Sequence, residues 1–219
     1  MKIKTAILLI ILAVMMCGCV ERLERPKKII PSDYFPLHEG DRYLFSSSKG
    51  EAVVTRQLDN LFTKTYYDSA GHPLSHEDYI LDEHGGVYWN NMYFGSARLA
   101  SVHFVPSLPF APWSNIVGDT LLVSAVEIRS DSTNTHVRVQ VAYEIMAIES
   151  VVTPAGLFED CVKVRMSYSA LGGAASRVIA PEIIRWFARD VGVVKFETSL
   201  IKGELLEATV DGVSYPQNP

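Results

Sequence analysis

From Tyr34 onward this chain is a succession of short segments, rich in β-branched and aromatic residues, that are separated by turn residues. Within Phe158–Tyr168 the apolar positions 162, 164, 166 and 168 alternate with the polar positions 163, 165 and 167, as expected of a strand with one buried face. No window of useful length has a helical period. We therefore predict an all-β protein, built as an antiparallel sandwich or as a curled, partly closed sheet of about a dozen strands.

The boundaries of these strands follow from turn residues such as the Glu83–Gly86 connection, where glycine reaches a positive φ at no steric cost. The strands are predicted over Arg42–Ser47, Ala52–Leu58, Phe62–Asp68, Asp78–Leu81, Val87–Phe94, Thr120–Ile128, Val137–Val152, Phe158–Tyr168, Arg177–Phe187, Val193–Leu200 and Glu204–Val210. A weak similarity between residues 35–46 and 111–124 leaves open whether residues 34–108 and 109–212 are two related halves.

The N-terminus has the layout of a bacterial export signal. Lys2 and Lys4 precede the apolar run Ala6–Met16, which is too short to span a bilayer, since a spanning helix needs about 20 apolar residues. The following Met16–Cys19 resembles the lipobox of bacterial lipoproteins. That resemblance implies that Cys19 is lipidated and becomes the first residue of the mature protein, with Cys17 as the rival acceptor. An ordinary signal peptide or an uncleaved anchor is the alternative.

These features divide the chain into four parts. Residues 1–18 are predicted to be a lipoprotein signal peptide, 19–32 a lipidated N-terminus and tether, 33–212 a β-rich domain and 213–219 a C-terminal tail. A first helical turn packed on the domain is the alternative for the tether. We expect anchorage in the cell envelope. The outer membrane is favoured over the inner one because Val20, rather than Asp, follows Cys19.

Charge and cysteine content limit the possible partners. The chain has 20 Lys and Arg against 25 Asp and Glu, a net charge of −5. Cleavage before Cys19 would remove Lys2 and Lys4 and leave 18 basic residues against 25 acidic ones, a net charge of −7. Because nucleic-acid binding needs clustered Lys and Arg, we expect no nucleic-acid partner. The membrane is the expected partner, through the N-terminal lipid, and a protein or lipid ligand stays open.

Four segments together resemble a family of uncharacterised bacterial lipoproteins and cell-surface proteins. The matching segments are Tyr34–Tyr43, Val117–Thr120, Thr153–Val164 and Trp186–Lys195. The resemblance implies a shared β-rich fold, with Phe158 and Val162 as inward-facing anchors. It implies no activity, because the family has none that we can name. Arg189 and Asp190 depart from the residues usual in that family.

Two groups of residues have the chemistry of a reactive site. Imidazole and carboxylate side chains suitable for zinc or manganese gather between residues 72 and 84, namely His72, His76, Glu77, Asp78, Asp82, Glu83 and His84. An extended segment separates His76 and His84 by roughly 26 Å, so we favour solvated hairpin tips. Cys161 is a candidate nucleophile because Lys163 and Arg165 are predicted on its face, but we favour a packing role. With no catalytic motif, we expect no catalytic residue, cofactor or metal.

The proline-containing segment 103–113 offers a possible ligand surface. Phe104, Phe110 and Trp113 could form a rigid apolar ledge, since prolines lower the cost of ordering a loop. The alternative, which we favour, is a loop that closes the end of the sheet with its aromatic side chains turned inward.

The sequence therefore predicts a lipid-anchored envelope protein that acts as a non-enzymatic binding or structural module. A carrier of an apolar ligand, such as a lipid, is the first alternative, and an enclosed apolar cavity would distinguish it from a structural module. A hydrolase that uses Cys161 is the second.

Overall fold

The computed structural model describes residues 29–47, 50–95, 100–130, 135–171 and 180–216, and nearly all of this chain is extended. One short 3₁₀ helix, η1 (Pro31–Tyr34), precedes the strands. The strands are β1 (Arg42–Phe45), β2 (Ala52–Leu58), β3 (Leu61–Tyr67), β4 (Pro73–Leu81), β5 (Val87–Phe94), β6 (Ala100–Pro109), β7 (Thr120–Ser130), β8 (His136–Thr153), β9 (Gly156–Ala170), β10 (Glu182–Ala188), β11 (Gly192–Thr198), β12 (Lys202–Val210) and β13 (Val213–Tyr215).

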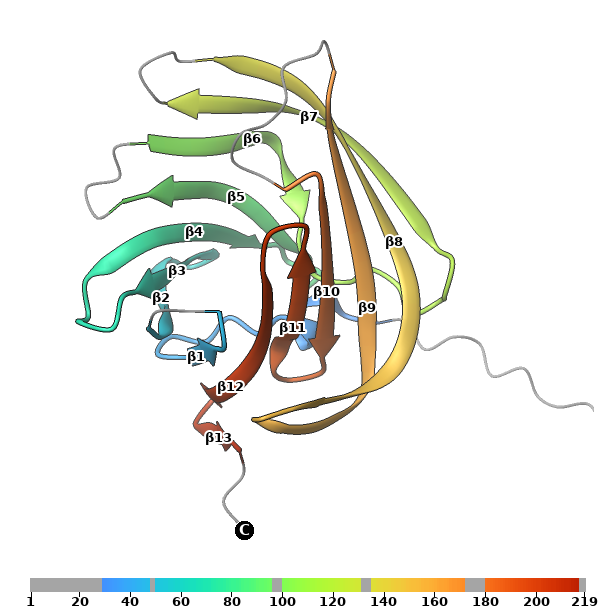
Figure 1. The fold of residues 1–219 in the computed structure, drawn as a ribbon. Helices are drawn as coiled ribbons and strands as arrows, with labels where there is room; N and C mark the ends of the chain where they lie inside the picture. The colour runs from blue at the N-terminus through green and yellow to red at the C-terminus, as the bar shows by residue number, and fades with distance from the viewer. Residues whose placement is uncertain (1–28, 48–49, 96–99, 131–134, 172–179, 217–219) are drawn as a thin grey trace, which may run out of the picture.

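The strands form one antiparallel sheet that closes on itself. Each strand pairs with its neighbours in chain order, and β1 also pairs with β12, for example Tyr43 with Ala208. Strands β1–β12 thus make a closed barrel, while β13 pairs with Ala208–Val210 at the end of β12. Figure 1 shows β3–β6 on one side, the long strands β7–β9 arching over the other, and β10–β12 completing the wall. The all-β prediction is confirmed, as a closed sheet.

The interior is filled by one face of each strand. The predicted inward set of β9 is confirmed, because Val162, Val164, Met166 and Tyr168 are all buried. Phe158 is buried as well, as the family resemblance implied. Within the described ranges, no helix is long and apolar enough to cross a membrane.

Segment 103–113 departs from the prediction, because most of it is strand β6 and not a loop. The prolines are tolerated for positional reasons. β6 pairs with β7 only from Ser101 to Val105, so Pro106 lies beyond the stretch in which β7 would require its missing N–H. Strand β4 also differs from the prediction, because it begins at Pro73 and not at Asp78. Residues 177–179, at the start of the predicted strand Arg177–Phe187, lie outside the described part.

η1 closes one end of the barrel. The Ser32 N–H donates to the Gly85 carbonyl at 2.9 Å, and the Asp190 N–H donates to the Asp33 carbonyl at 2.6 Å. Arg189 pairs with the Asp33 carboxylate at 3.3 Å. Two hairpin turns, β4–β5 and β10–β11, therefore hold η1 between them. Of the residues that the sequence assigns to the tether, Ile29 is buried here, while Ile30 is exposed.

Candidate functional site

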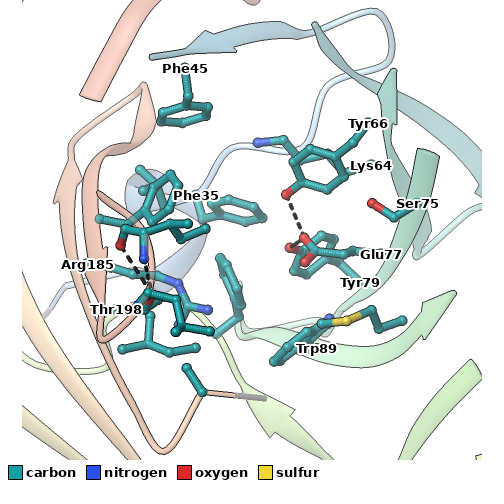
Figure 2. Close-up of a pocket in the computed structure, with 18 of the residues that line it drawn as sticks. Phe35, Phe45, Lys64, Tyr66, Ser75, Glu77, Tyr79, Trp89, Arg185 and Thr198 are labelled. Atoms are coloured by element: carbon teal, nitrogen blue, oxygen red, sulfur yellow. Dashed lines mark hydrogen bonds between the residues drawn. The ribbon is translucent and has the colours of Figure 1, made fainter. Parts of the chain in front are cut away.

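The barrel contains a pocket of about 450 Å³ between the wall β3–β5 and the wall β10–β11. This volume lies within the range of small-molecule sites, about 300–1,000 Å³. Aromatic rings provide much of its lining, namely Phe35, Phe45, Tyr66, Tyr79, Trp89, Phe94, Phe110 and Phe196. Figure 2 shows these walls with three charged side chains, Lys64, Glu77 and Arg185, among them.

Strand alternation brings the charged residues inside. In β3, Lys64 follows Phe62 and precedes Tyr66 at two-residue spacing, so all three share the inner face. In the β3–β4 ladder Lys64 is opposite Glu77, and in the β10–β11 ladder Arg185 is opposite Phe196. Two adjacent strands, β3 and β4, and the distant strand β10 therefore contribute one charged group each.

The floor of the pocket is an aromatic cluster next to η1. The Phe35 ring centroid lies 5.0 Å from that of Tyr79 and 4.6 Å from that of Phe110. Phe110 also meets Phe187 edge-on, with centroids 6.0 Å apart. These tilted and edge-on contacts are the favoured arrangements of aromatic pairs. The segment that carries η1 and Phe35 therefore closes this end of the pocket.

Lys64 is held in an aromatic cage and is 3% exposed. Its Nζ lies 3.7 Å from the ring centroid of Tyr43, with Phe35, Phe45 and Tyr66 further out at 5.5, 5.9 and 5.9 Å. Burial lowers the pKa of Lys64 from its ordinary 10.5 to about 8, although the nearby carboxylates Glu77 and Asp41 act in the opposite direction. The ammonium is thus a buried cation that ring faces stabilise only in part.

Glu77 is held by two phenols. Its Oε2 accepts hydrogen bonds from the Tyr66 hydroxyl at 2.7 Å and from the Tyr79 hydroxyl at 2.5 Å. The pKa values of both tyrosines are raised well above the ordinary value, first by burial and then by Glu77. The carboxylate is therefore fixed against one wall of the pocket (Figure 2).

Arg185 reaches into the pocket from the opposite wall. Its guanidinium carbon lies 4.6 Å above the ring centroid of Phe110, and its Nη1 lies 4.0 Å from the sulfur of Met166. Its charge also opposes the rise in the pKa of Tyr66 and Tyr79, so it acts on the same phenols as Glu77. A π face and a thioether are weak partners for a guanidinium, which has five N–H donors.

The rim of the pocket is apolar. Leu200 and Ile201, in the β11–β12 turn, both line the pocket and are 86% and 54% exposed. The Thr198 Oγ1 fixes this turn by accepting the N–H groups of Leu200 and Ile201 at 3.1 and 3.0 Å. The entrance therefore offers apolar surface to whatever enters.

The predicted aromatic ledge is not present as a surface. Phe104 is 1% exposed and Phe110 is 8% exposed, while Trp113 packs edge-on against Tyr143 with ring centroids 5.9 Å apart. The rings turn inward because strand β6 directs Phe104 into the core, which is the alternative that the sequence favoured. Of the three, Phe110 lines the pocket.

Cys161 lies in the core, fully buried, where its thiol donates to the Phe158 carbonyl at 3.4 Å. The lowering of its pKa by Lys163 and Arg165 that the sequence suggested is not found, because burial dominates and the nearby carboxylates Asp160 and Glu149 act in the same direction. Burial raises the pKa of the thiol to about 12. A neutral thiol is a poor nucleophile.

The histidine and carboxylate group between residues 72 and 84 is dispersed. Asp68 binds the backbone N–H groups of Ala70 and His72, and Asp82 binds those of His84 and Gly86. In the described part of the chain, no three His, Cys, Asp or Glu side chains are grouped to hold a metal ion. The interpretation as solvated hairpin tips fits the turns that Asp68 and Asp82 hold, but it does not fit strand β4, which lies between these turns.

Glu77 and Asp78, in that strand, point to opposite faces. Asp78 is buried, accepts the Thr63 hydroxyl at 2.7 Å and is contacted by Asn91 at 3.4 Å. Sequence reasoning missed Glu77 and Lys64 as pocket residues. The available signal was the alternation of β3, which places Lys64 on the same face as Phe62 and Tyr66.

Comparisons with known proteins agree with this architecture. Residues 116–210, less than half of the chain, match a protein-family model described as DUF3108-like. A solved structure from Parabacteroides distasonis, named "putative lipoprotein", is 17% identical, with a TM-score of 0.50, and the match covers 80% of this chain and 98% of that one. The similarity shows a shared fold. No curated protein matches the sequence.

A second solved structure has weaker similarity. It is a "putative exported protein with YmcC-like fold" from Bacteroides fragilis, 17% identical, with a TM-score of 0.47 and coverage of 80% of this chain and 98% of that one.

Proposed function

We propose that this protein is a lipid-anchored envelope protein that binds an apolar small molecule inside its closed sheet and catalyses no reaction. The observation that carries the proposal is the pocket of about 450 Å³, with its aromatic walls and its exposed apolar rim. Sites for small molecules are typically concave, mostly apolar and provided with a few polar groups. A purely structural module would have no need of such an interior.

The export signal supports the envelope location. The segment Met16–Cys19 resembles a lipobox, and a solved structure of similar fold is named "putative lipoprotein". Val20 after Cys19 favours the outer membrane. Residues 19–28 would link the lipid to the end of the barrel that η1 closes, and an extended chain of this length spans roughly 33 Å. The pocket rim lies at the other ends of β4 and β11, so the entrance faces away from η1.

The proposal is tested by photolabelling the full lipidated chain in native membranes with a neutral long-chain alcohol that carries a diazirine. We expect adducts on peptides that line the pocket. Ser75→Trp should abolish them by filling the pocket, because Ser75 lines it from β4. Ser124→Trp is the matched control, since Ser124 is exposed on β7 away from the pocket. Equal labelling in both variants, or no pocket adduct in the wild type, would contradict the proposal.

A further inference from the structure

The pocket has an excess of positive charge. Lys64, Arg185 and Glu77 are the charged residues among its described lining residues. With Lys64 protonated, two cations therefore face one carboxylate in an aromatic interior. A buried charge without a partner is costly, so this arrangement favours a ligand that brings a negative charge.

Neither cation has an anionic partner in the described part of the chain. Every described ion pair joins other residues, and none places a carboxylate oxygen within 4.0 Å of Lys64 or Arg185. Instead, Lys64 rests on the Tyr43 ring at 3.7 Å and Arg185 on the Phe110 ring at 4.6 Å. Only 3% of the surface of Lys64 is exposed to solvent.

Glu77 does not fill this role, although it is the cross-strand neighbour of Lys64. Its Oε2 is occupied by the hydroxyls of Tyr66 and Tyr79 at 2.7 and 2.5 Å. Two short hydrogen bonds fix this oxygen on the phenols, and no oxygen of the carboxylate lies within 4.0 Å of the ammonium. The three charged groups therefore line the pocket without a close ion pair among them, although Glu77 acts on Lys64 at longer range (Figure 2).

We propose that the pocket binds an acidic amphiphile, whose carboxylate or phosphate pairs with Lys64 and Arg185 and whose apolar chain extends along Phe196 toward Leu200 and Ile201. This inference rests on the proposed function and specifies the ligand class. A guanidinium presents a planar fork that matches the oxygens of either anion, and an ammonium supplies a compact second charge.

The position of the charges along the strands sets the orientation of the ligand. Lys64 lies two residues deeper than Tyr66 on β3, and Arg185 lies two residues deeper than Ile183 on β10. The exposed apolar residues are at the opposite end, in the β11–β12 turn. The anionic group therefore enters first and the chain end stays at the rim.

The test uses three diazirine-bearing alkyl probes of equal length, ending in a carboxylate, a phosphate or a hydroxyl, on the full chain in membranes. Lys64→Met and Arg185→Met should each lower the ratio of acidic-probe labelling to alcohol labelling of the pocket about tenfold, since a charged hydrogen bond contributes roughly that factor. Lys163→Met is the matched control, because Lys163 also contacts a ring, that of Trp186 at 4.7 Å, but lies outside the pocket.

The outcomes separate the two proposals. The acidic probe that labels more strongly identifies the anionic group as a carboxylate or a phosphate. If neither pocket variant reduces labelling by either acid while the alcohol still labels the pocket, the acidic amphiphile is wrong and the proposed function stands. If no probe labels the pocket of the wild type, both proposals fail. We expect Lys64→Met to fold, because it removes a buried charge. Arg185→Met tests the same prediction with a second variant.

Discussion

Lys64 lies in an environment that is unusual for a lysine, since it is buried among aromatic rings. Burial in an aromatic cage lowers its pKa to about 8, whereas in the unfolded chain it is hydrated and has its ordinary value of 10.5. The folded protein therefore pays a cost for keeping this residue charged at neutral pH. Its identity as a pocket residue could be inferred from strand alternation, but its lack of an ion pair could not, because this depends on Tyr66 and Tyr79 holding Glu77 away.

The lowered pKa of Lys64 makes the free energy of unfolding depend on pH in a predictable direction. Because the folded pKa lies below the unfolded one, the unfolded chain binds more protons between about pH 8 and pH 10.5, and the free energy of unfolding rises with pH in that window. We expect Lys64→Met to be more stable than the wild type near neutral pH and to lose about 2 kcal/mol of that advantage by about pH 9.5. Urea unfolding of both proteins across this range measures it. A constant difference would contradict the shifted pKa.

The buried thiol of Cys161 gives a second prediction at this scale. With Cys17 and Cys19 replaced by serine, Cys161 is the remaining cysteine of the chain. We expect no reaction with a thiol reagent in the folded state at neutral pH, and complete reaction after unfolding in urea, because burial raises the pKa of the thiol to about 12. Rapid reaction of the folded protein would revive the hydrolase alternative.

At the scale of elements, the strands that alternate clearly were predicted closely. β2 and β5 have the predicted bounds, and β8 and β9 differ by one or two residues at each end. β6 was missed because its prolines indicate a loop, whereas their effect depends on which neighbour strand is present at each position. The role of η1 depends on contacts with two distant turns, which local sequence does not encode.

The aromatic floor next to η1 should contribute strongly to stability. Phe35 is 2% exposed and packs on Tyr79 and Phe110. We expect Phe35→Ala to lower the free energy of unfolding by about 3–5 kcal/mol, since it leaves a cavity in the core. Arg42→Ala is the control, because the exposed Arg42–Glu51 pair should contribute about 1 kcal/mol or less. Similar losses for both, measured by chemical denaturation, would contradict this packing.

The pocket wall depends on close approach between β11 and β12 at Gly203. A Cβ at this position would lie 2.4 Å from the Phe196 ring and 2.6 Å from the Ser47 hydroxyl. We expect Gly203→Ala to lower the melting temperature, with a cost of about 1–3 kcal/mol from overpacking, and to push Phe196 toward the pocket. Lys202→Ala, at the exposed neighbouring position, should have little effect. An unchanged melting temperature in Gly203→Ala would show that the ring can move freely.

At the scale of the whole molecule, closure of the sheet creates the site. The pairing of β1 with β12 joins residues more than 150 positions apart, for example Arg42 with Thr209, and brings the wall β10–β11 opposite β3–β5. The strand pattern predicts a sandwich or a curled, partly closed sheet, but it does not specify which strands face each other across the interior. The pocket therefore could not be predicted from sequence, although most of its lining residues lie on strands that the sequence did predict. Whether residues 34–108 and 109–212 are related halves stays a prediction.

The central claim is that the barrel interior is a binding site. Native mass spectrometry of the intact protein isolated from its own membranes tests this most directly, because it weighs the folded chain together with anything bound to it. We predict a single non-covalent adduct per wild-type chain, with the mass of an acidic amphiphile, that is absent in Ser75→Trp and retained in Ser124→Trp. A wild-type protein without an adduct, or an adduct that persists equally in Ser75→Trp, would contradict the account.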